Sequence, residues 1–537
     1  MNDICLMPRA LKFRLRPAVI AAASFSLAMV MAAPVHAQTV TAVLHSSLRV
    51  LDPIITTAYM SRNHGYMIFD TLLATDGAGK IQPQMAEKYT VSADGKTYTF
   101  TLRPGLKWHD GAAVKSDDCI ASITRFLSQD KMGQVTQGLV ASMKAIDDKS
   151  FQVVLKEPTD LILRTLAKPS GVPPFMMPKR IAETPGGQPI KEQIGSGPFK
   201  FLTAEFKPGL KAVYEKNRDY VPRSEPASGN AGGKVVNVDR VEWVTMPDAM
   251  TAVNALLNGE IDYIEQMPYD LLPMVEGKKD IKVEILDKSG YQTLMRMNHL
   301  YPPFNNKLIR QAAMFAINQD DVMMALIGNP KYYKTCAALF GCGTAYESSA
   351  GKDMLIPSNL EMAKKLLKEA KYDGTPVLVM HPTDVGLLAA QPVVIAQALR
   401  KAGFVVNLQS MDWQSVVTRR AVQEPVAKGG WNIFSTNFSI IDVMDPLRNP
   451  TTAANGKQAW FGWPDVPKIE ELRQGFARTS DPVKLKSLAD EVQKVAVDEG
   501  VVAPMGQYYV TAAYRTSLSG VMAESVPYFW NLKKTGK

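Results

Sequence analysis

The stretch from residue 376 to residue 408 limits the possible folds of this chain most, because strand and helix patterns alternate along it. Pro376 to Met380 is apolar enough for a buried strand. Pro392 to Ala402 has the spacing of a helix that Gly403 ends, and Phe404 to Leu408 again has the pattern of a strand. This order is that of a βαβ unit, whose parallel strands need a crossover helix. The sequence therefore predicts an α/β region with a parallel sheet.

The earlier part of the chain has a mixed α+β pattern. Thr39 to Val50 partly alternates apolar and polar residues, as a strand does, and Ser150 to Leu155 also has a strand pattern. Lys88 to Leu102 predicts a hairpin whose turn is built on an Asp-Gly pair. Lys115 to Leu127 has helical spacing. We therefore expect a region of α+β character before the βαβ unit.

The length of the chain predicts more than one lobe. Its 537 residues exceed what one hydrophobic core usually supports, and 46% hydrophobic and 21% charged residues describe an ordinary folded chain. No repeat and no low-complexity linker occurs in the sequence, so we expect the lobes to be joined by strands. Further helices are predicted at Leu308–Ala316, at Leu360–Ala370 and from Asp481-Pro482 onward.

The first residues have the layout of a secretory signal peptide. An apolar run from Pro17 to Met31 is preceded by four basic residues, Arg9, Lys12, Arg14 and Arg16. Val35-His36-Ala37 fits a cleavage site, so we expect the mature chain to begin near Gln38 and the protein to be periplasmic. The run is shorter than a membrane-spanning helix needs and no Cys follows it. A retained membrane anchor and a lipid anchor are therefore both disfavoured.

The charge of the chain does not indicate a nucleic-acid partner. The formal net charge is +9, and loss of the signal segment, with its four basic residues and Asp3, leaves +6. Nucleic-acid binding needs clustered basic residues, whereas pairs such as Lys278-Lys279 and Arg419-Arg420 are scattered. We therefore expect a mildly basic, solvated surface.

Three cysteines remain once Cys5 leaves with the signal segment. Five residues lie between Cys336 and Cys342 in a loop that contains glycine, and an oxidising compartment favours a local disulfide between them. Cys119 is expected to be a buried thiol. No CxxC or HExxH spacing occurs and the six His are dispersed, so we expect no metal site and no cofactor.

Several motifs in a fixed order resemble the extracytoplasmic peptide-binding proteins of ABC importers, the dipeptide and oligopeptide group. The most specific is Leu102-Arg103-Pro104-Gly105-Leu106-Lys107-Trp108-His109-Asp110-Gly111. The others are Pro83-Gln84-Met85-Ala86-Glu87, Tyr98-Thr99-Phe100, Asp117-Asp118, Gly195-Ser196-Gly197-Pro198-Phe199, Asn217-Arg218-Asp219-Tyr220, Asn258-Gly259-Glu260-Ile261-Asp262, Pro302-Pro303-Phe304 and Arg310-Gln311-Ala312. These residues are mostly architectural, so they identify a fold and not a solute.

The resemblance implies a two-lobed periplasmic binding protein fold with an interlobe cleft. The first lobe is expected at 38–285, with an inserted subdomain at about 75–190 and a C-terminal tail at 515–537 returning to it. The second lobe is expected at 286–514. Such a protein closes on a peptide or peptide-like solute by a hinge motion. It is implied to be a monomer that delivers the solute to the membrane permease subunits of an ABC transporter.

The resemblance also indicates where the ammonium group of a peptide would bind. In the family, an acid in a segment with Asp, two residues and then Asp-Pro binds this group, and the matching residue here is Asp442. A carboxylate buried in a cleft favours a cation, because an unpaired buried charge costs several kcal/mol. Asp445, which precedes Pro446, is a second candidate, although an Asp before Pro often starts a turn.

The expected site for the carboxylate of a dipeptide lacks its usual residue. In the family, an Arg on the loop after the strand at 376–380 binds this carboxylate, whereas this chain has His381 and Asp384 there and no Arg up to Ala390. Asp384 would repel a carboxylate, and His381 is mostly neutral at pH 7. The sequence therefore favours longer peptides, or a cationic or polar non-peptide solute, over a free dipeptide.

Aromatic residues and one early loop complete the candidate site. Phe438 and Trp413 are candidates to line pockets for the solute, although aromatic residues in a large lobe more often pack the core. The resemblance places the loop that contains Thr57 and Tyr59 at the cleft. Whether the other aromatic residues of the second lobe line pockets or pack the core is also open: Trp431, Trp460, Trp463, Tyr508 and Tyr509.

Two other functions remain open. An enzyme is disfavoured, because no GxSxG motif occurs and the SxxK and KTG triplets, at Ser128–Lys131 and Lys534–Gly536, lack the SDN element. A chemosensory or chaperone-like role would use the same fold, and the sequence does not separate it from solute import.

Overall fold

The computed structural model describes residues 38–246 and 248–536, which contain two mixed β-sheets, a four-stranded antiparallel sheet and three two-stranded ones. The predicted signal peptide, at residues 1–37, lies outside the described residues. Within the described ranges, no helix is both long and apolar enough to cross a membrane.

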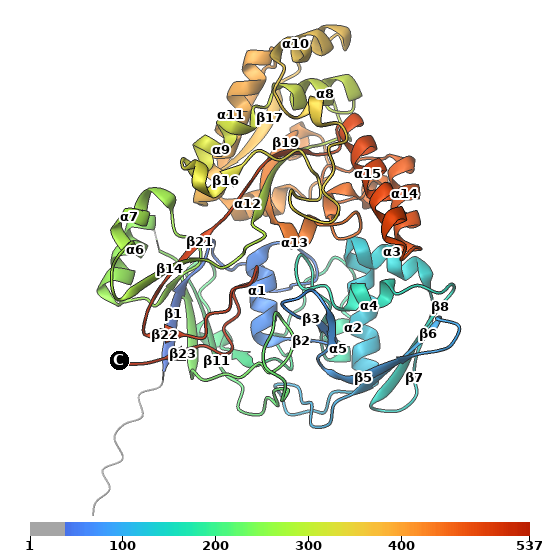
Figure 1. Cartoon of the computed structure of the whole chain (residues 1–537), viewed down its shortest axis with the longest axis vertical. Helices are drawn as coiled ribbons and strands as arrows, with labels where there is room; N and C mark the ends of the chain where they lie inside the picture. Colours follow the sequence, from blue (N-terminus) through green and yellow to red (C-terminus); the bar gives the residue numbers. More distant parts are fainter. Residues whose placement is uncertain (1–37, 247, 537) are drawn as a thin grey trace, which may run out of the picture. The chain divides into compact units, whose positions relative to one another are not determined.

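The first lobe is built on a seven-stranded sheet that combines distant parts of the chain (Figure 1). Its strand order is β10 (Phe199–Phe201), β11 (Lys211–Lys216), β12 (Arg240–Val244), β1 (Thr39–Val43), β13 (Tyr263–Ile264), β21 (Thr511–Arg515) and β14 (Ile281–Ile285). β1 runs parallel to β12 and β13, whereas β21 is antiparallel to β13 and β14. Helices α6 (Ala249–Asn258) and α7 (Leu272–Val275) belong to this lobe.

The first strand is shorter than predicted. β1 ends at Val43, whereas the sequence predicted a strand to Val50. The backbone N–H of His45 donates to the Glu265 carboxylate at 2.8 Å, and Nδ1 of His45 lies 2.7 Å from the same oxygen. A distant side chain therefore binds the amide that a longer strand would have paired in the sheet.

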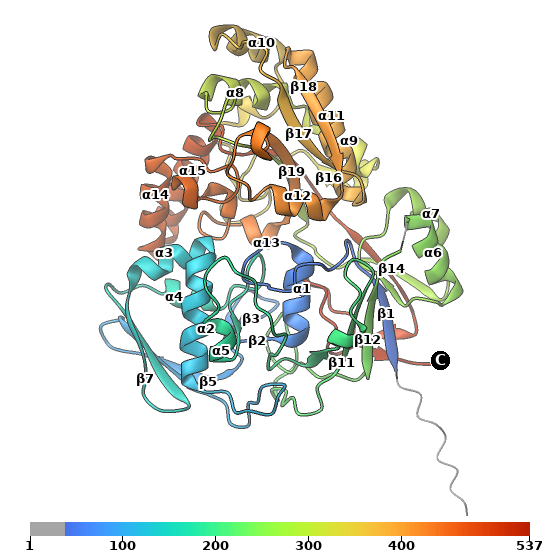
Figure 2. The same ribbon diagram turned by 180° about the vertical axis from the view of Figure 1, so that it is seen from behind.

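The inserted subdomain has its own four-stranded antiparallel sheet. Its order is β5 (Ala86–Val91), β6 (Thr97–Leu102), β8 (Ser150–Leu155) and β7 (Val140–Ala145). The predicted hairpin is the β5–β6 pair, and the predicted helix is α2 (Ser116–Gln129). Helices α3 (Lys131–Leu139), α4 (Leu161–Leu166) and α5 (Lys179–Ala182) follow (Figure 2). Helix α1 (Tyr59–Ile68) precedes the subdomain and packs against β10 of the large sheet.

The second lobe contains the predicted βαβ unit. Its six-stranded sheet has the order β16 (Tyr333–Lys334), β20 (Ala503–Tyr508), β15 (Tyr291–Met297), β19 (Ile433–Ser439), β17 (Val377–Pro382) and β18 (Val406–Met411). β17 is parallel to β18, and α11 (Gly386–Ala402) packs on both (Figure 2). α11 begins at Gly386, six residues before Pro392, which was the predicted first residue, so Pro392 lies inside the helix although an interior proline disfavours it.

The other predicted helices of the second lobe are also present. They are α8 (Lys307–Ala316), α10 (Leu360–Glu369) and α15 (Pro482–Asp498). Asp481 caps α15, because its carboxylate accepts hydrogen bonds from the N–H groups of Val483 and Lys484. The lobe also contains α9 (Gln319–Ile327), α12 (Trp413–Arg419), α13 (Ile440–Val443) and α14 (Pro467–Ala477).

Two short segments connect the sheets of the two lobes. Residues 286–290 run from β14 to β15, and residues 509–510 run from β20 to β21. The second segment comes before residue 514, the predicted end of the second lobe, because β21 already pairs in the first sheet. Gly290, with φ of 80°, lets the two connections approach, since a Cβ there would lie 2.6 Å from the carbonyl oxygen of Tyr508.

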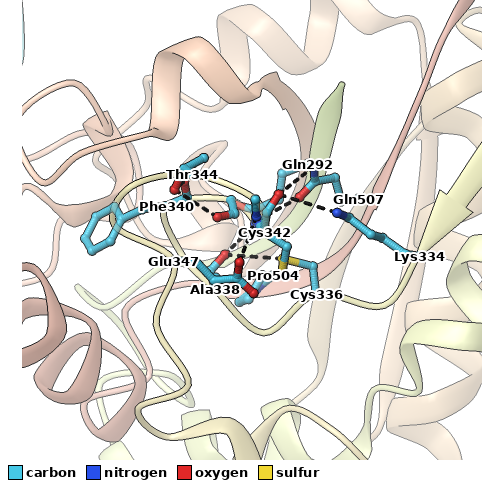
Figure 3. Close-up of a disulfide and its surroundings, with 12 residues drawn as sticks. Gln292, Lys334, Cys336, Ala338, Phe340, Cys342, Thr344, Glu347, Pro504 and Gln507 are labelled. Carbon is cyan, nitrogen blue, oxygen red and sulfur yellow. Dashed lines mark hydrogen bonds between the residues drawn. A yellow bond between two sulfur atoms is a disulfide. The ribbon is translucent and has the colours of Figure 1, made fainter. Parts of the chain in front are cut away.

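A disulfide links Cys336 to Cys342 close to these connections (Figure 3). The two sulfur atoms are 2.06 Å apart, and the two Cα atoms are 5.9 Å apart. Gln507 of β20 accepts a hydrogen bond from the N–H of Cys342 at 2.9 Å and donates to the carbonyl of Ser289 at 3.1 Å. The disulfide loop is therefore tied to the first connection. Cys119 is buried and unpaired.

Candidate ligand-binding site

Three adjoining cavities lie between residues of the two lobes. The large cavity, of about 640 Å³, is lined at the ends of β1, β13 and β17, from Val43 to His45, at Ile264 and from Thr383 to Leu387. The Asp442 cavity, of about 280 Å³, and the Arg420 cavity, of about 60 Å³, lie next to each other and share Thr57 and Phe438. In open α/β sheets, ligands bind beyond the carboxyl ends of the strands, and these cavities have that position.

Asp442 lies in the wall of its cavity and contacts the opposite lobe. It belongs to α13, directly after β19, and only 2% of its surface is exposed. Its Oδ2 accepts hydrogen bonds from the hydroxyl groups of Tyr59, at 2.6 Å, and Ser170, at 2.9 Å. Its Oδ1 has no hydrogen bond to any of the described residues, and it lies 3.4 Å from where a Cβ on Gly171 would be. One oxygen therefore joins the lobes, and the other is free for a donor.

The surroundings of Asp442 have opposing effects on the pKa of its carboxyl group. Burial raises the pKa of its carboxyl group, while the positive charges of Arg62 and Lys168 and the hydrogen bonds from Tyr59 and Ser170 lower it, and burial has the larger effect. Arg62 donates to Ser170 at 2.5 Å and lies 3.9 Å above the ring of Tyr59. The buried acid is thus held by donors but has no direct ion pair with a described residue.

Tyr59 connects the two lobes at this point. Its hydroxyl donates to Asp442 and accepts a hydrogen bond from the N–H of Ser439 at 2.7 Å. Burial and the neighbouring Asp442 raise its pKa well above the usual value, so the phenol remains a donor. Thr57, two residues earlier, lines both small cavities, and its buried Oγ1 has no partner among the residues described. The structure thus brings Thr57 and Tyr59 to the cleft together with Asp442.

Phe438 and Trp413 also lie at the cleft. Phe438 lines both small cavities, and its ring centre is 5.5 Å from that of Trp460. Trp413 lines the Arg420 cavity. Among the other rings, Trp460, Trp463 and Tyr508 line cavities, whereas Trp431 and Tyr509 do not. Their contact with a ligand stays a prediction.

Three predicted residues have other partners or other positions. Asp384 lines the large cavity, but its Oδ1 accepts a hydrogen bond from the N–H of Trp413 at 2.7 Å. His381 lines none of the three cavities, and its Nε2 lies 3.0 Å from the carbonyl of Ala389. Asp445 is also outside them and accepts hydrogen bonds from the N–H groups of Leu447 and Arg448, as a turn residue does. Asp445 instead lines a further cavity of about 380 Å³ between residues of the two lobes, and the ligand roles of His381 and Asp445 stay predictions.

No motif in the sequence indicated that Arg420 belongs to the site. Arg420 follows the last residue of α12, is 2% exposed and lines the cavity named after it. The adjacent Arg419 points elsewhere and donates to the carbonyls of Gly429 and Gly430. The signal that would have distinguished them is the phase of α12, in which Trp413, Val416, Val417 and Arg420 lie on the buried side.

Metal ligands do not gather anywhere in the part of the chain that the structure describes: no group of three or more His, Cys, Asp or Glu is placed to hold an ion. The cleft instead offers the buried carboxylate of Asp442, the buried guanidinium of Arg420, a buried Asp130–Lys168 ion pair and aromatic rings. Such a cavity is suited to hold a polar organic molecule by hydrogen bonds and charge.

The two sheets, the two connections and the cavities between them define a two-lobed solute-binding protein. Residues 80–459 match the model of the bacterial extracellular solute-binding proteins, family 5, and the chain belongs to this family. A probable peptide ABC transporter periplasmic-binding protein of Sinorhizobium fredii is 38% identical over 491 residues, which cover 91% of this chain and 92% of the relative.

Solved structures show the same fold. A periplasmic binding protein of A. tumefaciens R10 in complex with agropinic acid has a TM-score of 0.77 at 22% identity, over 93% of this chain and 99% of the other. An ABC transporter-associated periplasmic binding protein, DppA, of Helicobacter pylori in complex with the peptide STSA has a TM-score of 0.77 at 21% identity, over 93% of this chain and 98% of the other. At this identity, the likeness concerns the fold and not the solute.

Proposed function

We propose that this protein is a periplasmic receptor that binds a peptide or peptide-like solute in the interlobe cleft and delivers it to the permease subunits of an ABC transporter. The observation that carries the proposal is the buried carboxylate of Asp442, whose Oδ1 lies without a hydrogen-bond partner beside a cavity of about 280 Å³. Membership of the solute-binding family and the likeness to a probable peptide-binding relative support it.

The ammonium group of the solute binds Asp442 in this proposal. Tyr59 and Ser170 already use Oδ2, so an ammonium group at Oδ1 completes the hydrogen bonds of the carboxylate and balances its charge. A charge-assisted hydrogen bond of this kind is stronger than a neutral one. Because Tyr59 and Ser170 come from the first lobe and Asp442 from the second, a ligand at this point also stabilises the closed arrangement.

Mass spectrometry tests the proposal directly. Protein purified from a bacterial periplasm is denatured, and the released small molecules are identified; the refolded protein is then offered short peptides from a casein digest. We expect a stoichiometric peptide in the native mass spectrum and a rise in Tm with peptide concentration. No bound peptide and no change in Tm would contradict the proposal. N-terminal sequencing of the same preparation tests cleavage near Ala37, and its measured molar mass tests the monomer.

We also infer that the protein carries out no reaction on the solute. The family comprises solute-binding proteins, and the hydroxyl of Tyr59 hydrogen-bonds Oδ2 of Asp442 and not a base that could activate it for attack. Bound peptides are expected to be recovered with unchanged mass after long incubation. A cationic or polar non-peptide solute is the alternative, and the molecules released from the native preparation distinguish it.

A further inference from the structure

Arg420 is a buried cation with no anionic partner among the residues that the structure describes. Its side chain is 2% exposed, and burial lowers the pKa of its guanidinium group to about 9. Nε and Nη2 are both buried and have no hydrogen-bond acceptor among residues 38–246 and 248–536. A buried charge is normally paired and hydrogen-bonded, because its removal from water is costly. The partner of this group is therefore to be sought outside the chain.

Aromatic rings surround the guanidinium group but leave its hydrogen bonds unmade. Its central carbon lies 4.8 Å from the ring centre of Phe461, 5.6 Å from that of Trp413 and 6.0 Å from those of Phe434 and Trp460. Cation–π contacts of this kind hold the side chain in place. They provide no acceptor for N–H groups that point along the plane of the guanidinium. The rings therefore hold the side chain of Arg420 in place but accept no hydrogen bond in the plane of its guanidinium group.

Arg296 is a buried arginine of the same lobe whose guanidinium group has its hydrogen bonds within the protein. It is equally buried, and burial also lowers its pKa to about 9. Its guanidinium donates to four backbone carbonyls, those of Thr451 and Val501 at 2.9 and 2.7 Å and those of Phe461 and Trp460 at 2.5 and 3.2 Å. Buried Arg125 and Arg473 each leave one nitrogen unpaired, but each has an ion pair with an acid, whereas Arg420 has none among the described residues.

Other donors at the cleft also lack partners. The indole Nε1 of Trp460 is buried without an acceptor among the described residues, and Trp460 lines the neighbouring Asp442 cavity. Thr57 Oγ1, which is shared by both small cavities, has no partner there either. Arg and Trp side chains only donate hydrogen bonds, so a ligand here would have to provide acceptors.

We propose that Arg420 binds a carboxylate of the solute in the Arg420 cavity, with Trp460 as an additional donor beside it. A carboxylate has two oxygens that match the fork of the guanidinium N–H groups. The proposal rests on the proposed function in that it describes the same cleft. Arg420, which follows α12, would provide the cation that the loop after β17 lacks. The solute is then a zwitterion, with its ammonium group at Asp442 and its carboxylate at Arg420.

Arg420→Met tests the proposal with acetate as a probe. Methionine keeps an unbranched side chain but removes the charge, and Arg419→Met removes the same charge one residue away, outside the three cavities. We expect sodium acetate, compared with sodium chloride at equal ionic strength, to raise the Tm of the wild type and of Arg419→Met but not of Arg420→Met. The proposal is overturned if acetate does not raise the Tm of the wild type, or if acetate also raises the Tm of Arg420→Met. This arm does not depend on any peptide being bound.

The second arm uses a peptide selected from the casein digest and its C-terminal amide. We expect Arg420→Met to weaken binding of the free acid about thirtyfold or more, with no such loss for Arg419→Met. If the amide binds the wild type as weakly as the variant binds the acid, the carboxylate is the C-terminal one. If the amide binds like the acid and the loss in Arg420→Met persists, the carboxylate belongs to a side chain.

The Tm of the ligand-free variants separates binding from structure. Removing an unpaired buried charge is expected to leave the Tm of Arg420→Met unchanged or higher, because nothing in the chain loses a hydrogen bond. A lower Tm together with equal losses for the acid and the amide would assign Arg420 to the packing of the lobe and overturn the proposal. Failure of the whole casein pool to bind would instead reject the peptide function and leave the acetate result to decide on Arg420.

Discussion

Asp442→Asn isolates the charge of the buried carboxylate, because the amide keeps the size of the side chain and an oxygen for Tyr59. If Asp442 binds the ammonium group of the solute, the variant loses a charge-assisted hydrogen bond in a site where the side chain is 2% exposed. Removing one partner of a buried charged pair costs about 2–5 kcal/mol, a roughly thirtyfold to several-thousandfold rise in Kd.

The stability of the ligand-free protein is expected to change in the opposite sense. Burial raises the pKa of Asp442, so the folded protein holds this proton more firmly than the unfolded chain does. This contribution to stability therefore falls as pH rises from the usual pKa to the raised one, and at pH 7 the ionised group costs folding free energy. Asparagine avoids that cost, so the Tm of the variant at pH 7 should equal or exceed that of the wild type.

Calorimetric titration with the selected peptide and a thermal melt of the ligand-free protein measure both effects. Asp481→Asn is the matched control, because Asp481 is an acid of the same lobe that caps α15 outside the three cavities. Its Kd should be that of the wild type. The reasoning is refuted if Asp442→Asn binds the peptide with unchanged Kd, or if the two variants lose affinity equally.

Three further results are expected. Peptide affinity should fall on acidification through the raised pKa of Asp442, and titrations across acidic pH should show that Asp442→Asn lacks this fall; an equal fall in both proteins would implicate another group. Replacing Cys336 and Cys342 by alanine should cost about 2 kcal/mol, the loop entropy of a short disulfide ring, which a denaturant titration detects; unchanged stability would show the bond to be absent. Gly290→Ala should lower Tm, because φ of 80° and the carbonyl of Tyr508 both oppose a Cβ; an unaltered Tm would mean that the connections move apart freely.

Local sequence patterns predicted the elements that follow one another in the chain and also pack against one another. The βαβ unit of the second lobe, the hairpin of the inserted subdomain and the capped helix after Asp481 were all visible in the spacing of apolar residues. The end of β1 was not, because it depends on Glu265, more than two hundred residues away in the chain. Contacts between distant residues leave no local signal.

The candidate site was predicted as far as single motifs allow. Asp442 was found through its Asp-x-x-Asp-Pro segment, and the structure adds Ser170 and Arg62, which no motif marks. Arg420 was passed over as half of a basic pair, because adjacent residues on a helix point in different directions and the sequence does not show which one faces inward. The absence of an arginine after β17 led to a prediction against a free dipeptide, and the proposed role of Arg420 is an alternative to that prediction.

The position of β21 has a consequence for how the molecule is made. This strand lies between β13 and β14, yet it is synthesised after the whole second lobe. Until residues 511–515 arrive, two strands of the earlier half have no neighbour on the sides that face each other. A chain released early during synthesis or export would retain this gap, so only a nearly finished polypeptide can acquire a complete first sheet and offer its cleft to a solute.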